Sequence, residues 1–388
     1  MTALSEFTDF QNMSPPIYLR GPTEMVNDAI VQVPLLGRLL LNRDMNQILQ
    51  GGSTIRDTIK LNVTTTYKTY SPGSPYGGYP IRQSSSLNEI RWRYSRDHMA
   101  WTEAELLQNI PAGQTAQARG GVYKKLQYSK EQDLWTSIFN GIEDQLLAPA
   151  ADETANMESA GGEKPYSLYA LINEETNRVA NGWTVVQNIS RTDGSANATN
   201  WQNRRVLYDA NQPDDQDSDN DGLLDAFEEM YLTLQFIPPR LPGTEQFFQR
   251  SGRDPVKMFI AASTSGVQVY KRRLLERNDT LAGREDPAFT APKYGGIDVV
   301  QVSNLGSATL YDGASTPATE SNATTSGSRY FWIDGNFLTP IFHVSKFFDK
   351  QKSFVLQEQP DTTVQIVSVW YNLFLNSALR QGIVSPGA

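Results

Sequence analysis

Apolar and polar positions alternate most regularly on either side of a segment rich in Gly, Pro and Ser, residues 70–86. The alternating apolar residues are Ile59, Leu61, Val63 and Tyr67 before this segment, and Ile90, Trp92 and Tyr94 after it. A period of two with many β-branched and aromatic residues is typical of strands. The pattern predicts a long β-hairpin with its tip at 70–86. A two-stranded hairpin is marginally stable alone, so we expect a neighbour to cover its apolar face.

A helical period follows the hairpin. No proline occurs between Gln114 and Ala148, and Pro149 ends the segment. Apolar residues recur at spacings of three and four: Leu134, Trp135, Ile138, Phe139, Ile142 and Leu146. This spacing predicts one long helix with a buried stripe. A weaker helical pattern covers Leu35–Leu49, in an arm that Pro15, Pro16, Pro22 and Pro34 otherwise interrupt.

The rest of the chain mixes short strands with helices. Three apolar runs predict buried strands: Val256–Ala262, Gly296–Val302 and Thr363–Leu375. Residues 267–277 have helical spacing and carry the basic run Lys271-Arg272-Arg273 on the other side. Residues 303–328 are rich in Gly, Ser, Thr and Ala and predict a surface loop. Strands and helices in this order indicate an α+β fold.

Composition excludes several kinds of chemistry. The 388 residues include no cysteine and only two histidines, and the formal net charge is -9. Disulfides, thiolate metal sites and cysteine nucleophiles are therefore excluded. We expect His98 and His343 to be structural. No P-loop, G-x-S-x-G or paired-carboxylate site is present, so the sequence predicts a protein that is not an enzyme and has no catalytic residues.

The sequence also bears on secretion and on membrane insertion. The first residues carry no cationic and apolar signal-peptide pattern, and no stretch approaches the roughly 20 apolar residues of a membrane helix. We therefore expect no membrane association, and folding in the compartment where the chain is made.

One motif carries specific chemistry. Asp217 to Glu228, DSDNDGLLDAFE, matches the calcium loop D-x-[DN]-x-[DN]-G-x5-E at every defined position. The predicted ligands of a structural Ca²⁺ are Asp217, Asp219, Asp221, the Leu223 carbonyl, Asp225 and Glu228. Hard oxygen donors at this spacing suit calcium better than softer metals.

The surroundings of this loop leave two interpretations open. Pro213 precedes it, so the incoming helix of an EF-hand is missing, whereas an outgoing helix is expected at Ala226–Phe236. The loop is therefore closer to those of dockerin and thrombospondin-type repeats. The alternative is a solvated acidic loop at a helix start, where carboxylates favour the helix dipole.

The order of elements, and three late segments, resemble the Hong Kong 97 fold of tailed-bacteriophage major capsid proteins. The segments are KYGGIDVVQVSNL (293–305), SRYFWIDGNFLTPIFH (328–343) and the run 359–384. The resemblance implies five parts. They are an N-terminal arm (1–54), an E-loop hairpin (55–102), a P-domain with the spine helix (103–165), an A-domain with a calcium-loop insertion near 209–236 (166–345), and C-terminal strands returning to the core (346–388).

The same resemblance implies a structural function. Such a protein self-assembles as hexamers and pentamers into the icosahedral head shell of a virion, in the host cytoplasm. The E-loop and the N-arm would contact neighbouring subunits. Separate scaffolding, portal and decoration proteins, and packaged double-stranded DNA in non-specific contact, are the other implied partners. Some family members join subunits through a lysine at the hairpin tip. Residues 70–86 contain no lysine, so we expect no cross-link.

A second hypothesis is an extracellular bacterial calcium-binding surface or adhesive protein, where such calcium loops are common. The lack of a signal-peptide pattern and of tandem loops favours the capsid hypothesis over this alternative.

Overall fold

A computed structural model describes most of the chain. The described residues are 34–41, 48–49, 51–60, 85–102, 104–105, 116–148, 162–172, 185–190, 201–208, 222–234, 258–278, 292–306, 309–311, 317–319 and 328–386. The chain divides into two compact units. Unit 1 comprises Met1–Gln32, Tyr94–Ile142 and Val344–Trp370, and unit 2 comprises Val33–Arg93, Glu143–His343 and Tyr371–Ala388.

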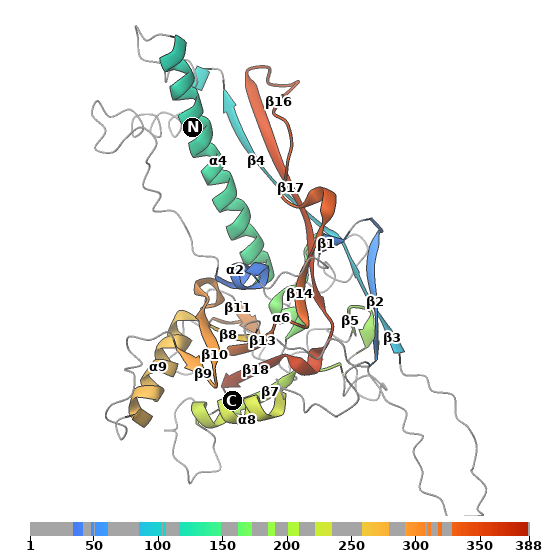
Figure 1. Ribbon diagram of the computed structural model, residues 1–388, viewed down its shortest axis with the longest axis vertical. Coiled ribbons are helices and arrows are strands. Elements are labelled where there is room, and N and C mark those ends of the chain that lie inside the picture. The colour runs from blue at the N-terminus through green and yellow to red at the C-terminus, as the bar shows by residue number, and fades with distance from the viewer. Residues whose placement is uncertain are drawn as a thin grey trace, which may run out of the picture. The chain divides into compact units, whose positions relative to one another are not determined.

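Unit 2 is built on a six-stranded mixed sheet (Figure 1). In spatial order its strands are β7 (Arg204–Tyr208), β18 (Gly382–Pro386), β13 (Tyr330–Asp334), β8 (Met258–Ala262), β10 (Ile297–Gln301) and β9 (Lys293–Tyr294). Pairs β7–β18 and β8–β10 are parallel, and the other neighbours are antiparallel. The predicted strands at 256–262 and 296–302 are confirmed as β8 and β10.

Helices α8 (Leu223–Leu234) and α9 (Thr264–Asn278) cover one face of this sheet. The buried stripe of α8 is Leu223, Leu224, Phe227, Met230 and Leu234. Gly382 of β18 permits the close approach of α8, because a Cβ there would lie 2.5 Å from the Met230 sulfur. On the other face, Phe331 meets Tyr169 of the short helix α6 (Leu168–Leu171) edge to face at 5.1 Å.

The helix predicted at 267–277 is confirmed as α9, although it begins at Thr264. The Ser263 hydroxyl accepts a hydrogen bond from the Gly266 N–H at 3.1 Å, which is the bond of an N-cap residue. Val267 and Tyr270 are buried against the sheet, whereas Arg272 is exposed. Because Ser263 caps the helix, α9 begins directly after β8, three residues earlier than the apolar spacing predicts.

The second six-stranded sheet is centred on β17 (Thr362–Leu375), which confirms the central strand predicted at 363–375. Within unit 2, β17 pairs with β14 (Leu338–His343), which also pairs with β1 (Ile48–Leu49). Within unit 1, β17 pairs with β4 (Arg93–Thr102), β15 (Asp349–Lys350) and β16 (Phe354–Val355).

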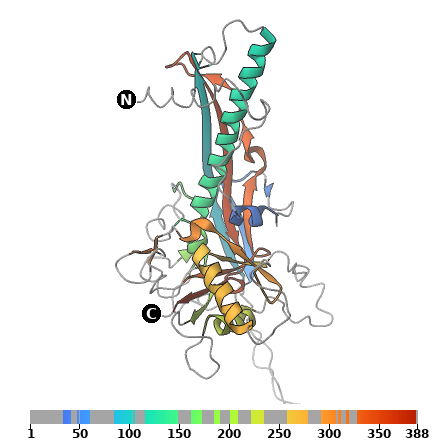
Figure 2. The same cartoon turned by 90° about the vertical axis from the view of Figure 1, so that its left-hand side faces the viewer.

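The long helix predicted at 114–148 is confirmed as α4 (Ala116–Leu146). Within unit 1, α4 lies beside β4 and β17 in both views (Figure 1, Figure 2). Leu134, Ile138 and Ile142 are buried as predicted, whereas Trp135 and Phe139 are only half-buried. The buried stripe is therefore narrower than the sequence pattern suggests.

The predicted helix at 35–49 is wrong at its end, and residues 42–47 lie outside the described residues. Helix α2 spans Pro34–Leu41, with Pro34 at the first helical position, where its missing N–H costs nothing. Ile48 and Leu49 instead form β1, parallel to β14. The pairing with β14 outweighs a weak helical propensity, since apolar periodicity over few residues does not distinguish helix from strand.

The predicted hairpin is confirmed in β2 (Thr54–Lys60) and β3 (Ser85–Arg91), with Ile55 opposite Ile90. Leu61, Val63 and Tyr67 of the predicted first strand, and most of the predicted tip (residues 70–84), lie outside the described residues. The return strand does not continue to Tyr94 as predicted. β4 starts at Arg93 and pairs with β17, and the Tyr94 side chain is 63% exposed. One alternating pattern thus covers two strands with different partners.

Smaller elements complete the described part of the chain. Two short hairpins are β5–β6 (Val185–Val186, Ile189–Ser190) and β11–β12 (Thr309–Tyr311, Pro317–Thr319). The 3-10 turns are η3 (Ser303–Gly306), η5 (Val344–Lys346) and η6 (Ala378–Arg380). The segment predicted as a loop at 303–328 therefore contains a hairpin, because short paired strands need no apolar alternation.

Candidate functional sites

The base of the β2–β3 hairpin is held by buried amide groups of unit 2. Asn88 is fully buried, and its Nδ2 donates to the Leu375 carbonyl of β17 at 2.7 Å. The next residue, Glu89, donates its backbone N–H to the Gln187 carbonyl at 3.2 Å. Gln187 and Asn188 form the turn between β5 and β6, with φ of 53° and 64°. The hairpin is therefore attached both to β17 and to a second hairpin.

Asn372 of β17 makes the complementary attachment. This buried side chain accepts the Tyr166 N–H at 2.9 Å and donates to the Arg91 carbonyl at 2.8 Å. Buried amides are costly unless their hydrogen bonds are satisfied, so such contacts favour one arrangement over all others. The base of the hairpin, unlike a simple surface loop, thus has a fixed direction relative to β17 within unit 2.

The two faces of the hairpin differ in character. Ile55 and Ile90 are buried, whereas Arg56 and Glu89 form an ion pair on the other face, with Nε and Oε2 2.9 Å apart. The hydrogen bond from Arg56 lowers the pKa of Glu89. The apolar side alone is available for packing.

His343 lies at the end of β14, as the sequence predicts for a structural histidine. Its ring meets Trp92 edge to face, with centroids 5.2 Å apart, and its Nε2 accepts the Gly51 N–H at 3.4 Å. Trp92 in turn donates its Nε1–H to the Gly52 carbonyl at 3.0 Å. The histidine therefore helps to hold the start of β2.

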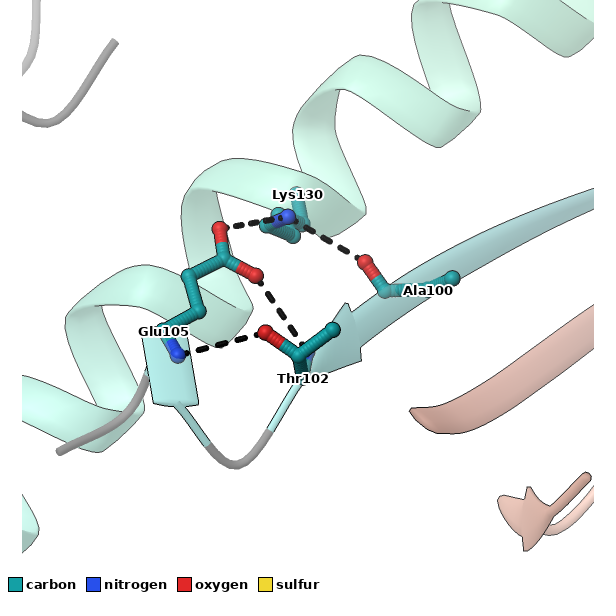
Figure 3. A network of polar contacts seen from close by, with 4 residues as sticks. All are labelled: Ala100, Thr102, Glu105 and Lys130. Atoms are coloured by element: carbon teal, nitrogen blue, oxygen red, sulfur yellow. Dashed lines mark hydrogen bonds and ion pairs between the residues drawn. The ribbon is translucent and has the colours of Figure 1, made fainter. Parts of the chain in front are cut away.

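In unit 1, a polar network fixes the middle of α4 (Figure 3). Lys130 donates to the Ala100 carbonyl at 3.1 Å and pairs with Glu105 Oε1 at 2.8 Å. Thr102 and Glu105 form a reciprocal capping box. The Glu105 N–H donates to the Thr102 hydroxyl at 3.2 Å, and the Thr102 N–H donates to Glu105 Oε2 at 3.4 Å. The end of β4 is thereby attached to the helix.

The half-buried side of α4 carries an aromatic cluster. Trp135 and Phe139 stack with centroids 6.0 Å apart, and Phe348 lies 5.9 Å from Trp135 and 5.5 Å from Phe139. All three side chains keep part of their surface in solvent. This cluster is apolar surface that unit 1 does not cover by itself.

A buried carboxylate sits at the opposite end of α4, in unit 2. Glu143 is fully buried, and its Oε2 accepts the Leu36 N–H near the start of α2 at 3.2 Å. Its Oε1 has no hydrogen-bond partner among the described residues. Burial raises the pKa of Glu143 from an ordinary 4.5 to about 7, although the Leu36 N–H acts in the opposite direction.

The predicted calcium ligands are only partly within the described residues. Asp217, Asp219 and Asp221 lie outside them. Leu223, Asp225 and Glu228 lie in the first two turns of α8, where Asp225 is half-buried and Glu228 is exposed. The helix starts at Leu223 rather than at Ala226 as predicted, because the Ala226 N–H bonds the Gly222 carbonyl at 3.0 Å. The calcium site stays a prediction.

Two negative findings concern the described residues. They contain no group of three or more His, Cys, Asp or Glu side chains placed to hold a metal ion. In the same part of the chain, no helix is long and apolar enough to cross a membrane.

No protein-family model matches the sequence, and no curated protein sequence matches it. Solved structures do match. A chain of the cyanophage A-1(L) capsid is 12% identical with a TM-score of 0.57, over 96% of this chain and 98% of the other. A chain of the capsid of an empty GTA particle is 7% identical with a TM-score of 0.51, over 97% of this chain and 96% of the other. A chain of the capsid of Myoviridae phage XM1 is 9% identical with a TM-score of 0.50, over 97% of this chain and 98% of the other.

At these identities the likeness concerns the fold, and it extends over almost the whole of each chain. The α+β fold predicted from the sequence is confirmed, whereas its division into N-arm, E-loop, P-domain and A-domain stays a prediction. The chain has the Hong Kong 97-type fold of tailed-phage capsid structures.

Proposed function

We propose that the protein is a major capsid protein that self-assembles, as pentamers and hexamers, into an icosahedral shell around phage DNA. The observation that carries the proposal is the match over almost the whole of both chains with capsid chains at 12% identity or less. A match that covers 96% or more of both chains concerns almost the whole architecture. The proposed role is structural, and no catalytic site is assigned.

Features of the two units support this proposal. Unit 1 exposes several large apolar side chains, among them Tyr94, Phe354 and Val355, at 63%, 42% and 54%. Exposed apolar groups of this kind mark protein interfaces when they gather in patches. In unit 2, the buried amides at Asn88 and Asn372 fix the base of a hairpin whose tip would reach a neighbouring subunit.

The test is to express the chain and image the product by electron microscopy. Closed shells or capsomer rings support the proposal. Sheets or monomers under all assembly conditions contradict it, and would favour the extracellular calcium-binding surface protein instead. Coexpression with a scaffolding protein belongs in the same experiment, because we propose that scaffolding, portal and decoration functions reside in separate proteins.

A shortened hairpin tests how the shell forms. Replacing residues 61–84 with a two-residue Asn-Gly turn leaves β2 and β3 intact, since the turn then joins Lys60 directly to Ser85, the last pair of the two strands. The variant should stay folded by circular dichroism, yet form few shells. Normal shell yield would show that the hairpin is not an assembly element.

We also propose that the loop 217–228 binds one structural Ca²⁺. Five carboxylates within twelve residues repel one another unless a cation lies among them. Asp217, Asp219, Asp221, Asp225 and Glu228 would supply carboxylate oxygens, and Leu223 a carbonyl. The ion would order the segment before α8.

Calorimetry and thermal melting test the calcium proposal. Wild type should take up calcium and melt at a higher temperature with calcium than with chelator, because binding to the folded state alone stabilises it. The double variant Asp219→Ala/Glu228→Ala should lose both effects. Glu229→Ala, which removes an adjacent carboxylate at no ligand position, is the matched control. Unchanged melting and no uptake by wild type at millimolar calcium would leave only an acidic loop.

A further inference from the structure

The outer face of α8 is acidic, with one exposed leucine. Glu228, Glu229, Leu232 and Thr233 are exposed, and Leu232 keeps 66% of its surface in solvent. Glu229 and Leu232 are three residues apart and so share one side of the helix. Within the described residues, neither glutamate forms an ion pair. Among the described residues, this face therefore has no charged partner.

The sequence concentrates negative charge around this helix. Residues 206–239 contain nine carboxylates and no lysine or arginine: Asp209, Asp214, Asp215, Asp217, Asp219, Asp221, Asp225, Glu228 and Glu229. The whole chain has 43 acidic and 34 basic residues, a difference of nine. All of the net charge is therefore in this one segment, and the remaining residues balance.

The neighbouring helix α9 carries the opposite charge. Lys271, Arg272 and Arg273 are consecutive, and Arg272 is exposed. Lys271 and Arg272 have no ion pair among the described residues. Both helices cover the same face of the sheet, and Phe227 of α8 stacks on Tyr270 of α9 with centroids 5.2 Å apart. One unit thus presents an acidic and a basic helix face.

We propose that the outer face of α8, with Glu229 beside Leu232, docks in one copy against the basic run of α9 in the next copy. This contact rests on the proposed function, since it needs several copies in one assembly. Charge selects the geometry. An isologous α8–α8 contact would place carboxylates against carboxylates, whereas a head-to-tail contact pairs opposite charges and can close into a ring. Leu232 lies at the centre of the acidic face and becomes buried.

A nucleic acid is the less suitable occupant of the α9 run. Three basic residues on one helix turn neutralise few phosphates. They also lie beside α8, the described part of the acidic segment, whose Asp225, Glu228 and Glu229 repel a phosphate backbone. A second copy brings that acidic segment as its partner and has no such repulsion.

Exposed ion pairs are weak, typically below about 1 kcal/mol each, so the contact should act mainly on the rate and salt dependence of assembly. Repetition in every copy of a ring multiplies a small effect on each contact. Assembly yield is therefore a more sensitive measurement than subunit stability.

Charge exchange tests the proposal. Glu229→Arg and Arg272→Glu alter exposed side chains, so both variants should fold like wild type by circular dichroism. Each alone should reduce the initial rate of assembly, followed by light scattering at about 0.1 M salt, by several-fold. The combined variant should recover most of the wild-type rate. Glu163→Arg, an exposed carboxylate of the same unit, is the control and should assemble normally.

Several outcomes would overturn the contact. Single variants that assemble at the wild-type rate show that these faces do not meet. A combined variant as slow as the single ones shows that they do not pair with each other. Arg272→Glu shells that form normally but retain less DNA assign the basic run to nucleic acid. Wild type that forms no shell or ring overturns the proposed function itself, and the contact with it.

Discussion

The two units close their interiors to different degrees. In unit 2, Phe227 lies between four aromatic rings, at 5.2 Å from Tyr270, 5.4 Å from Tyr294, 5.0 Å from Tyr330 and 5.3 Å from Trp332. Phe227, Tyr270, Tyr330 and Trp332 are fully buried. In unit 1, the aromatic cluster of Trp135, Phe139 and Phe348 is half-buried. One unit completes its core within the chain, and the other does not.

The same contrast appears in the large apolar residues that are exposed. Unit 1 exposes Tyr94, Tyr128, Val344, Phe354 and Val355, each at 42% or more, although it is the smaller part of the described chain. The exposed large apolar residues of unit 2 are Leu87, Val185, Leu207 and Leu232, at the hairpin, at a strand edge and on α8. The difference suggests that unit 2 carries the stability of the free subunit, whereas unit 1 gains much of its burial when copies assemble.

The largest expected effect follows from the closed core of unit 2. Phe227→Ala removes a ring that is buried on all sides, so the free energy of unfolding should fall by about 3–5 kcal/mol. Urea unfolding of the unassembled subunit, followed by tryptophan fluorescence, measures this. Leu232→Ala on the exposed side of the same helix is the control and should cost less than about 0.5 kcal/mol. Equal losses for the two variants would mean that α8 does not bury the Phe227 face.

The next effect concerns the buried charge of unit 2. Glu143 has a pKa of about 7 in the folded protein and an ordinary value of 4.5, so the folded state binds more protons between these two pH values. Stability from this group is therefore complete below pH 4.5 and is lost as pH rises through 7. The loss should be on the order of 2 kcal/mol after allowance for screening.

Glu143→Gln isolates this effect, because the amide keeps a carbonyl oxygen for the Leu36 N–H and cannot ionise. Its urea midpoint should lack the decline that wild type shows between pH 5 and pH 8. Glu163→Gln removes an exposed carboxylate of the same unit and should keep the wild-type profile. A wild-type midpoint that rises over this range, or a decline that persists in Glu143→Gln, would contradict the assignment.

Sequence reasoning succeeds where a long element shows one period. Residues 116–146 have uninterrupted helical spacing and form α4, and residues 362–375 form β17. It fails where the partner lies far along the chain. The alternation of Ile90, Trp92 and Tyr94 suggests one strand, yet β3 pairs with β2 and β4 pairs with β17. A period of two reveals a strand and says nothing of which strand it will meet.

The candidate sites divide in the same way. The calcium motif is local, so its spacing can be read from residues 217–228 without a structure. Glu143 and the Asn88–Asn372 attachments are not local. In the sequence, Glu143 has the pattern of an ordinary helix residue. Only the structure shows that the N–H of Leu36, 107 residues earlier, lies 3.2 Å from its Oε2. Asn372 stands between apolar residues in the second half of β17, and a polar residue at that place is a signal that could have indicated a buried hydrogen-bonding role.

A smaller effect is expected in the open cluster of unit 1. A fully buried Phe139 would lose about 3–5 kcal/mol on substitution by alanine, but its ring is half exposed. Phe139→Ala should therefore cost about 1–2 kcal/mol in the unassembled subunit. The loss in thermal stability should be greater for assembled particles, if neighbouring copies cover the cluster. A loss as large as that of Phe227→Ala in the free subunit would remove the contrast between the units.

The smallest expected effect tests whether the network around Lys130 differs from an ordinary surface ion pair. Lys130 has two partners, the Ala100 carbonyl and a Glu105 that the Thr102 capping box already orients, so less side-chain entropy is lost on pairing. Lys130→Met keeps a long apolar side chain but removes the interactions with both partners. It should lower the free energy of unfolding by about 1 kcal/mol. Lys350→Met removes the ion pair with Glu131, which lacks such orientation, and should cost roughly 0–0.5 kcal/mol. Urea unfolding in low and high salt distinguishes the two variants. The destabilisation caused by Lys350→Met should vanish in 1 M salt, because salt screens an exposed ion pair. Part of the destabilisation caused by Lys130→Met should persist, because the hydrogen bond to the Ala100 carbonyl is also lost. Equal losses that salt abolishes alike would show that the network adds nothing beyond surface electrostatics.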